Sequence, residues 1–166
     1  MKIIIIDGYN VIHHSPFLKT LLSRNVYRAQ IELIKMACDY CSVEGIKGYV
    51  VFDAYRHSGG EVKKTVSPLV KVIYTGEGET ADSYIERFII QNKSKYSYIY
   101  VITSDYLEGE TVLDKNILPV SPKSFLQETH SSHKFIKEKY SSNVPFMDYF
   151  LPTELFRKIR NKLKKP

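Results

Sequence analysis

The chain has 166 residues, of which 43% are hydrophobic and 25% charged, and its formal net charge is +6. This is the length and composition of one globular domain with a real hydrophobic core, so we expect one functional site rather than several modules. No stretch approaches the roughly 18 consecutive apolar residues that cross a bilayer, so we expect no membrane partner.

Short apolar runs alternate with helical patterns from the N-terminus to about residue 130, a succession typical of βαβ units. The predicted strands are Lys2 to Ile6, Gly48 to Phe52, Leu69 to Tyr74, Tyr98 to Ile102 and Ile117 to Val120. We therefore predict an α/β fold, a single domain over residues 1–166. Its central sheet should be mostly parallel, with about five strands, and flanked by helices.

The first predicted strand is very short, because its apolar run from Ile3 to Ile6 ends at Asp7. A secretory signal peptide has a longer apolar run, so we interpret this segment as a buried strand.

The helix predicted before the second strand has one apolar face and ends near Gly45, since glycine commonly stops helices. That face carries Tyr27, Ile31, Ile34, Cys38 and Cys41. The sequence has no second cysteine pair and no secretory context. We interpret the two cysteines as reduced thiols in or near the core, in preference to a redox pair or half of a zinc site. We then expect a cytoplasmic protein.

Two further helices are predicted downstream. One carries Ala81, Ile85, Phe88, Ile89 and Asn92 on a single face. Ser121 and Pro122 are typical of the N-cap and first turn of another helix, which carries Phe125 and Leu126. Residues 131–148 are polar and irregular, and we expect them to form a long arm across the surface.

Most of the positive charge lies at the C-terminus, where residues 153–166 contain six basic residues and one acidic residue. Pro152 and Thr153 open a predicted helix there, with its apolar residues inward and its basic residues largely outward. Such a local basic strip indicates a polyanionic partner such as nucleic acid. The residues expected to contact it are Arg157, Lys158, Arg160 and Lys162, with Arg56, Lys63 and Lys64 as a second basic group.

Acidic residues follow three of the predicted strands. Asp7 follows the first strand, Asp53 the second and Asp105 the fourth. Ligands of an open parallel sheet bind beyond the carboxyl ends of its strands, so these three acids should share one edge. Asp82 reaches the same edge from the first turn of a helix that Thr80 can cap.

Each acid alone has an ordinary structural interpretation, because Asp is common after strands and in first helical turns. Four together differ, since converging carboxylates repel one another and raise each other's pKa values unless a cation lies between them. Oxygen ligands favour a hard divalent ion, Mg²⁺ or Mn²⁺, over Zn²⁺. We therefore predict a metal site made of Asp7, Asp53, Asp82 and Asp105.

A Mg²⁺ ion held by carboxylates beside a basic surface suits the hydrolysis of phosphodiester bonds. Asn10 can orient a water molecule or a carboxylate, and Ser104 or Thr103 can donate a hydrogen bond to phosphate. The predicted catalytic residues are Asp7, Asn10, Asp82 and Asp105, with Ser104 as a substrate-binding residue.

Four segments carry a family resemblance. They are Ile5-Ile6-Asp7-Gly8-Tyr9-Asn10-Val11-Ile12, Phe52-Asp53-Ala54, Thr80-Ala81-Asp82-Ser83-Tyr84-Ile85-Glu86 and Val101-Ile102-Thr103-Ser104-Asp105. In order and spacing they resemble the NYN nucleases of the YacP type, relatives of the PIN domains. The resemblance implies a PIN-like fold and a metal-dependent endoribonuclease, for this type a bacterial protein that acts on mRNA in association with the ribosome. By the family's pattern, Asp7, Asn10, Asp53, Asp82 and Asp105 map to the acidic site.

One alternative stays open. A catalytically weak PIN-like fold could bind RNA or the ribosome through its basic tail and serve as an adaptor. The intact set of acids argues against it, because a protein that only binds phosphate gains nothing from concentrating negative charge. Tyrosines near the same edge can either stack on bases or pack the strand ends, namely Tyr9, Tyr55, Tyr74 and Tyr106.

Overall fold

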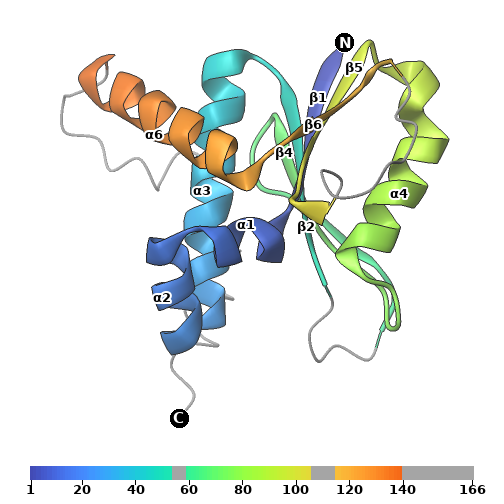
Figure 1. Cartoon of the computed structure of the whole chain (residues 1–166), viewed down its shortest axis with the longest axis horizontal. Coiled ribbons are helices and arrows are strands. Elements are labelled where there is room, and N and C mark those ends of the chain that lie inside the picture. Colours follow the sequence, from blue (N-terminus) through green and yellow to red (C-terminus); the bar gives the residue numbers. More distant parts are fainter. Residues whose placement is uncertain (54–58, 106–114, 140–166) are drawn as a thin grey trace.

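A computed structural model describes residues 1–53, 59–105 and 115–139 of the chain (Figure 1). A six-stranded sheet with the strand order β3-β4-β2-β1-β5-β6 forms its centre. The strands are β1 (Lys2–Asp7), β2 (Lys47–Phe52), β3 (Val62–Thr65), β4 (Val70–Tyr74), β5 (Tyr98–Ile102) and β6 (Ile117–Val120). The helices are α1 (Gly8–His14), α2 (Pro16–Arg24), α3 (Val26–Glu44), α4 (Ala81–Asn92), the 3-10 turn η1 (Lys93–Lys95) and α6 (Pro122–Lys139).

The sheet is parallel except at one edge, where β3 runs antiparallel to β4. The predicted α/β class and the five predicted strands are confirmed. The sixth strand, β3, was not predicted from the sequence, and its residues Val62 to Thr65 are all exposed. A strand with no buried face lacks the alternation of apolar and polar residues by which strands are recognised.

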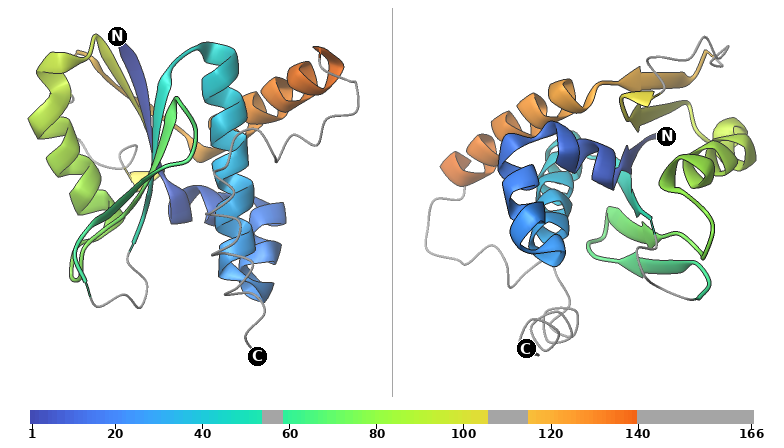
Figure 2. Two further views of the ribbon diagram at one scale, coloured as in Figure 1. Left: turned by 180° about the vertical axis from the view of Figure 1, so that it is seen from behind. Right: turned by 60° about the horizontal axis from the view of Figure 1, so that its bottom comes forward.

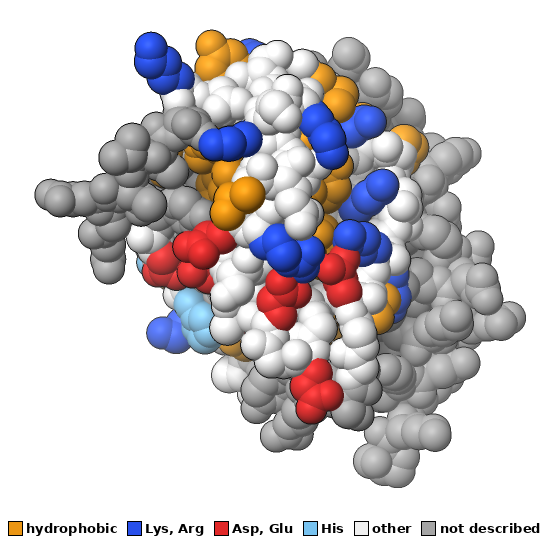
Figure 3. Space-filling view, turned by 90° about the vertical axis from the view of Figure 1, so that its right-hand side faces the viewer, with side chains coloured by type: hydrophobic (Ala, Val, Ile, Leu, Met, Phe, Trp, Pro, Cys, Tyr) orange, Lys and Arg blue, Asp and Glu red, His pale blue; other side chains and the backbone are white. Residues whose placement is uncertain are grey.

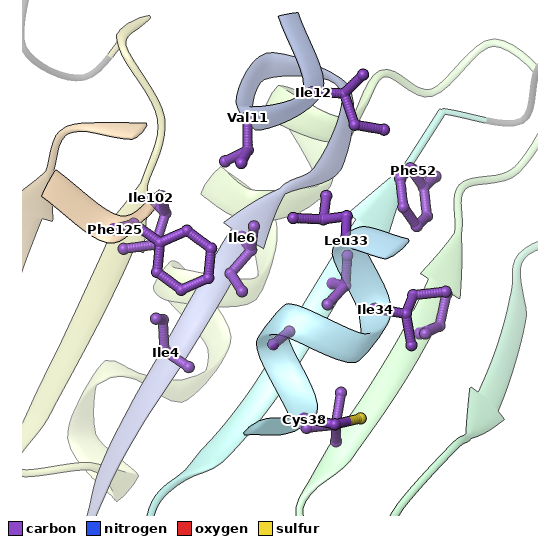
Figure 4. Close-up of a cluster of buried hydrophobic side chains, with 14 of the residues drawn as sticks. Ile4, Ile6, Val11, Ile12, Leu33, Ile34, Cys38, Phe52, Ile102 and Phe125 are labelled. Carbon is purple, nitrogen blue, oxygen red and sulfur yellow. The ribbon is translucent and has the colours of Figure 1, made fainter. Parts of the chain in front are cut away.

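Helices cover both faces of the sheet. Figures 1 and 2 show α1, α2, α3 and α6 on one side and α4 on the other. The side chains of β1 alternate between the two layers, because successive residues of a strand point to opposite faces. Ile4 and Ile6 enter the core beneath α1 and α3, which Figure 4 shows, while Ile3 and Ile5 enter the core beneath α4.

The long helix α3 begins and ends as its sequence suggests. Asn25 caps its N-terminus by accepting a hydrogen bond from the Arg28 amide, and Gly45 ends it in the left-handed conformation, with φ 64°. Its predicted apolar face was wrong at the start of the helix, because Tyr27 is 40% exposed. The buried face instead runs through Ala29, Leu33, Ile34, Ala37, Cys38 and Cys41.

Cys38 and Cys41 are free thiols inside this core, as predicted. Burial raises the pKa of the Cys38 thiol to about 11 and that of the Cys41 thiol to about 12. Both side chains therefore stay protonated at neutral pH and act as small apolar residues.

The segment predicted as an irregular arm, residues 131–148, was wrong over its first part, because α6 continues to Lys139. Phe125 anchors the helix in the core, and Tyr40 of α3 donates a hydrogen bond to Glu128. The buried hydroxyls of Thr129 and Ser132 bond to backbone carbonyls one turn earlier, so these polar residues fit a buried helix surface.

Residues 140–148 and the basic helix predicted over 153–166 lie outside the described residues, and the single-domain boundary 1–166 stays a prediction. Among the residues that the structure describes, no helix is long and apolar enough to cross a membrane.

The junction between β1 and α1 is closely packed against Phe52. A Cβ atom added at Gly8 would overlap the buried Phe52 ring, whereas one added at Gly60 meets nothing within 4 Å. We expect Gly8→Ala to lower the free energy of unfolding by about 1–3 kcal/mol, the usual cost of overpacking a core. Urea unfolding of Gly8→Ala beside Gly60→Ala tests this, and equal midpoints would contradict it.

Candidate active site

The topology brings four acidic side chains to one end of the sheet. Strands β1, β2 and β5 are parallel neighbours, so their carboxyl ends meet at one edge. Asp7 ends β1, Asp53 follows β2 and Asp105 stands shortly after β5. Asp82 joins them from the first turn of α4. The sequence analysis predicted this convergence.

Asp7 is the most buried of the four, with 8% of its surface exposed. Burial, which is the largest cause, and the charges of Asp53, Asp105 and Asp82 raise its pKa to about 6, although a hydrogen bond from the Asn10 amide opposes this. The other three acids therefore lie close enough to act on Asp7 electrostatically.

Asp7 also serves the fold. Its Oδ1 atom accepts a hydrogen bond from the backbone N–H of Asn10 at 3.0 Å and so caps α1. The ordinary interpretation of an acid at a helix start thus holds alongside the acidic cluster. A carboxylate that is fixed by a cap is held in one orientation.

Asn10 joins the start of α1 to the loop after β5. Its amide nitrogen donates to Ser104 Oγ at 2.8 Å and to Asp105 Oδ2 at 3.3 Å, and its Oδ1 accepts from the Ser104 N–H at 3.0 Å. Ser104 Oγ donates in turn to Asp105 Oδ1 at 3.1 Å. Asp105 is exposed, yet these bonds hold both of its carboxylate oxygens.

Asp53 joins the end of β2 to the start of α4. Its Oδ1 accepts a short hydrogen bond from the N–H of Ala81. Thr80 caps the same helix by accepting from the Ser83 N–H at 3.1 Å. Asp82 is half-buried in this turn, and burial, followed by the charges of Asp105 and Asp53, raises its pKa.

The loop before α4 is held by an arginine that the sequence analysis did not single out. Arg87 donates through Nε to Glu79 at 2.9 Å and through Nη2 to Glu61 at 3.2 Å, and Lys63 pairs with Glu61 at 2.5 Å. Glu79 directly precedes the Thr80 cap, so these ion pairs tie β3 and the loop to the helix that carries Asp82. Residues so far apart in sequence leave no local pattern from which this network could be predicted.

The predicted substrate-binding residues have different settings. Ser104 lies within the acidic cluster, Lys63 takes part in the ion pairs just described, and the Lys64 ammonium lies 5.5 Å from the centre of the Tyr74 ring. The remaining predicted contacts lie outside the described residues, namely Arg56, Arg157, Lys158, Arg160 and Lys162.

The carboxylate oxygens of the four acids fit a hard divalent ion that takes only a few of its ligands from the protein. Among the described residues, no three His, Cys, Asp or Glu side chains are grouped closely enough to hold a metal ion by themselves. Mg²⁺ does not need such a cage, because it keeps several waters and is usually held by one or two carboxylates together with substrate phosphates. The raised pKa of Asp7 shows that its anionic form is penalised, and a cation would relieve that penalty.

Comparisons with known proteins show the family of this chain. The chain matches the model of the YacP-like NYN domain over residues 4–166. It is 35% identical over 139 residues to the protein YacP of Bacillus subtilis, named as uncharacterized, which covers 84% of this chain and 81% of that relative. The chain belongs to the YacP-like NYN family. NYN domains are part of the PIN-like nuclease superfamily, which supports a nuclease-type function that concerns RNA.

Solved structures share the fold of this NYN domain. A crystal structure of Rae1 (YacP) from Bacillus subtilis matches with a TM-score of 0.71 and 34% identity, covering 85% of this chain and 80% of that chain. A mutant of the same protein matches with a TM-score of 0.67 and 33% identity, covering 87% of this chain and 86% of that chain.

The stability of the metal-free protein should depend on pH through Asp7. Its folded pKa of about 6 exceeds the ordinary aspartate pKa of 3.8, so the folded state binds more protons between these values and stability falls as pH rises through them. We expect Asp7→Asn to remove this fall, which amounts to at most about 3 kcal/mol. Asparagine still caps a helix. Urea unfolding in chelator from pH 4 to 7 measures it, and parallel pH dependences of the two proteins would contradict it.

Proposed function

We propose that this NYN protein is a metal-dependent endoribonuclease that hydrolyses RNA phosphodiester bonds with Mg²⁺ or Mn²⁺. The single observation that carries the proposal is the meeting of four carboxylates from four separate elements at one sheet edge, where burial first and then the charges of Asp53, Asp105 and Asp82 raise the pKa of Asp7 to about 6. Repulsion between carboxylates lowers the stability of a fold, and natural proteins keep such unfavourable arrangements mainly at functional sites. A cluster of carboxyl groups with raised pKa values therefore favours a catalytic site.

The residues divide the work of the site. Asp7, Asp53, Asp82 and Asp105 are the residues that would hold the metal ion, and Mg²⁺ usually needs only one or two carboxylates beside water and phosphate oxygens. When bound, the metal would lower the pKa of a water molecule and neutralise charge on the phosphate. Asn10 keeps the Asp105 carboxylate in place through its 3.3 Å hydrogen bond, and the Ser104 hydroxyl holds the other oxygen of that carboxylate by donating to it at 3.1 Å.

The family supports RNA as the substrate, and we propose mRNA cleaved in association with the ribosome, in the cytoplasm. The basic segment 153–166, with six basic residues and one acidic residue, suits a phosphate-rich surface such as ribosomal RNA.

Replacing one ligand should abolish cleavage and spare the fold. We expect Asp82→Asn to reduce cleavage beyond the roughly 10- to 100-fold that an outer-shell partner contributes, because Asp82 contributes ligand charge directly. The control is Glu86→Gln, which changes an exposed acid one turn along α4. The measurement is the rate of cleavage of single-stranded RNA during Mg²⁺ and Mn²⁺ titrations.

A variant Asp82→Asn that cleaves at the full rate would assign this residue a purely structural role. If the unaltered protein binds RNA or ribosomes but never cleaves with either metal, the adaptor alternative is correct instead.

The basic tail should bind phosphate without reading sequence. Changing Lys158, Arg160, Lys162 and Lys164 together to Gln should weaken binding to ribosomes, and it should weaken binding to RNA strands of different sequence by the same factor. Each lost contact to single-stranded RNA should also flatten the slope of log affinity against log salt by about 0.7. Co-sedimentation with ribosomes at several salt concentrations measures the affinity and its salt slope, and binding to short RNAs of different sequence measures the sequence independence. An unchanged affinity and slope would show that the tail only aids solubility.

A further inference from the structure

The two lysines of β3 face opposite sides of the sheet. Lys63 points to the side of α4, where it pairs with Glu61 and lies 5.9 Å from the centre of the Tyr84 ring. Lys64 points to the side of α1 and α3, where its ammonium lies 5.5 Å from the centre of the Tyr74 ring. One short edge strand thus places a cation beside an aromatic ring on each face.

The α4 face is already satisfied internally. Tyr84 is only 2% exposed, and Arg87 lies 4.8 Å from its ring centre while binding Glu79 and Glu61. Figure 3 shows the result, with Lys and Arg side chains directly beside Asp and Glu on this side of the molecule. Cations neutralised by neighbouring carboxylates attract phosphate weakly.

The opposite face of the sheet carries Lys64. Among the described residues, Lys64 has no carboxylate within ion-pair distance. The Tyr74 ring stacks on Phe52 with centres 5.7 Å apart, and Phe52 meets Tyr9 edge to face at 5.4 Å. Tyr9 lies in the first turn of α1, so these ring contacts connect the sheet edge at Lys64 with the helix that Asp7 caps.

Tyr27 completes this surface. Gln30 of α3 donates a hydrogen bond to the Tyr9 hydroxyl at 3.0 Å, and Tyr27 lies one helical turn before Gln30, so the start of α3 adjoins the row of rings. Tyr27 is 40% exposed in the first turn of α3, beside the exposed Arg28. An exposed ring near basic side chains is what single-stranded nucleic acid binds, since every base has a face that can stack.

We propose that single-stranded RNA reaches the acidic cluster along the face of α1 and α3, where Lys64 contacts a phosphate and Tyr27 stacks against a base. The surface is defined by Lys64, Tyr74 and Tyr27. The proposal rests on the proposed ribonuclease function, because that function makes the acidic cluster the place where the RNA is cut. It adds the side of the sheet on which the RNA lies and the prediction that this RNA is single-stranded. Paired RNA should not fit it, because stacked bases in a duplex expose no face to a tyrosine.

The molecule supplies a matched control at its other end. The Lys2 ammonium lies 6.0 Å from the centre of the Tyr98 ring, and Tyr98 is 41% exposed. This pair has the same chemistry and exposure but stands at the start of β1 and β5, at the edge opposite the acids.

Binding of a fluorescein-labelled single-stranded oligouridylate, followed by anisotropy in chelator, tests the surface without cleavage. Tyr27→Ala should weaken binding about fivefold or more, the lower end of the loss of one stacked base. Lys64→Gln should weaken it and reduce the salt slope by about 0.7. Tyr27→Phe keeps the ring and should bind as the unaltered protein does, as should Tyr98→Ala and Lys2→Gln.

Cleavage in Mg²⁺ separates this proposal from the function on which it rests. Tyr27→Ala should raise KM and leave kcat within about twofold, because stacking away from the reacting bond acts on binding. If Tyr27→Ala and Lys64→Gln match the control pair, or if Tyr27→Phe loses as much as Tyr27→Ala, the surface is refuted while the nuclease stands. If the variants lose binding but the unaltered protein cuts nothing, the nuclease fails and the binding surface stands.

Discussion

The mutual repulsion of four carboxylates at one sheet edge is the constraint around which this molecule is arranged. Like charges brought together in a partly buried site are costly unless something compensates them. Here the nearest compensation comes from neutral donors, the N–H groups of Asn10 and Ala81 and the side chain of Asn10. They fix the carboxylates without discharging them, which leaves negative potential for a cation to neutralise.

The same bonds explain why fold and site are hard to separate. Asp7 caps α1 and Asp53 holds the first N–H of α4, so two acids of the cluster also set where helices begin. A helix N-terminus carries partial positive charge, which makes an anion there locally favourable. Capping therefore makes two of the four carboxylates tolerable to the fold, and the structural and functional interpretations of these two acids are complementary.

The sequence was informative where physical rules act locally. Four of the five predicted strands and the convergence of Asp7, Asp53, Asp82 and Asp105 follow from apolar runs and from the rule that parallel strands end at one edge. The fifth, β6, was also found, although Pro119 interrupts its run. Tertiary context decided the rest. Tyr27 is not on the buried face of α3, because that helix buries Ala29 and Leu33 instead. Helix α6 extends beyond its apolar residues, and a hydroxyl in that part bonds to the helix's own backbone.

The edge strand β3 has two roles, which are to protect the edge of the sheet and to place two lysine side chains. Sheet edges carry unpaired backbone groups that invite another chain, and charged residues or proline discourage this. At one edge β3 presents Lys63 and Lys64, and at the other β6 presents Pro119. Because successive strand residues alternate in direction, adjacent lysines cannot point the same way. Two adjacent lysines at this edge thus place one cation in the ion pairs that hold the α4 loop and the other over the Tyr74 ring, which stacks on Phe52.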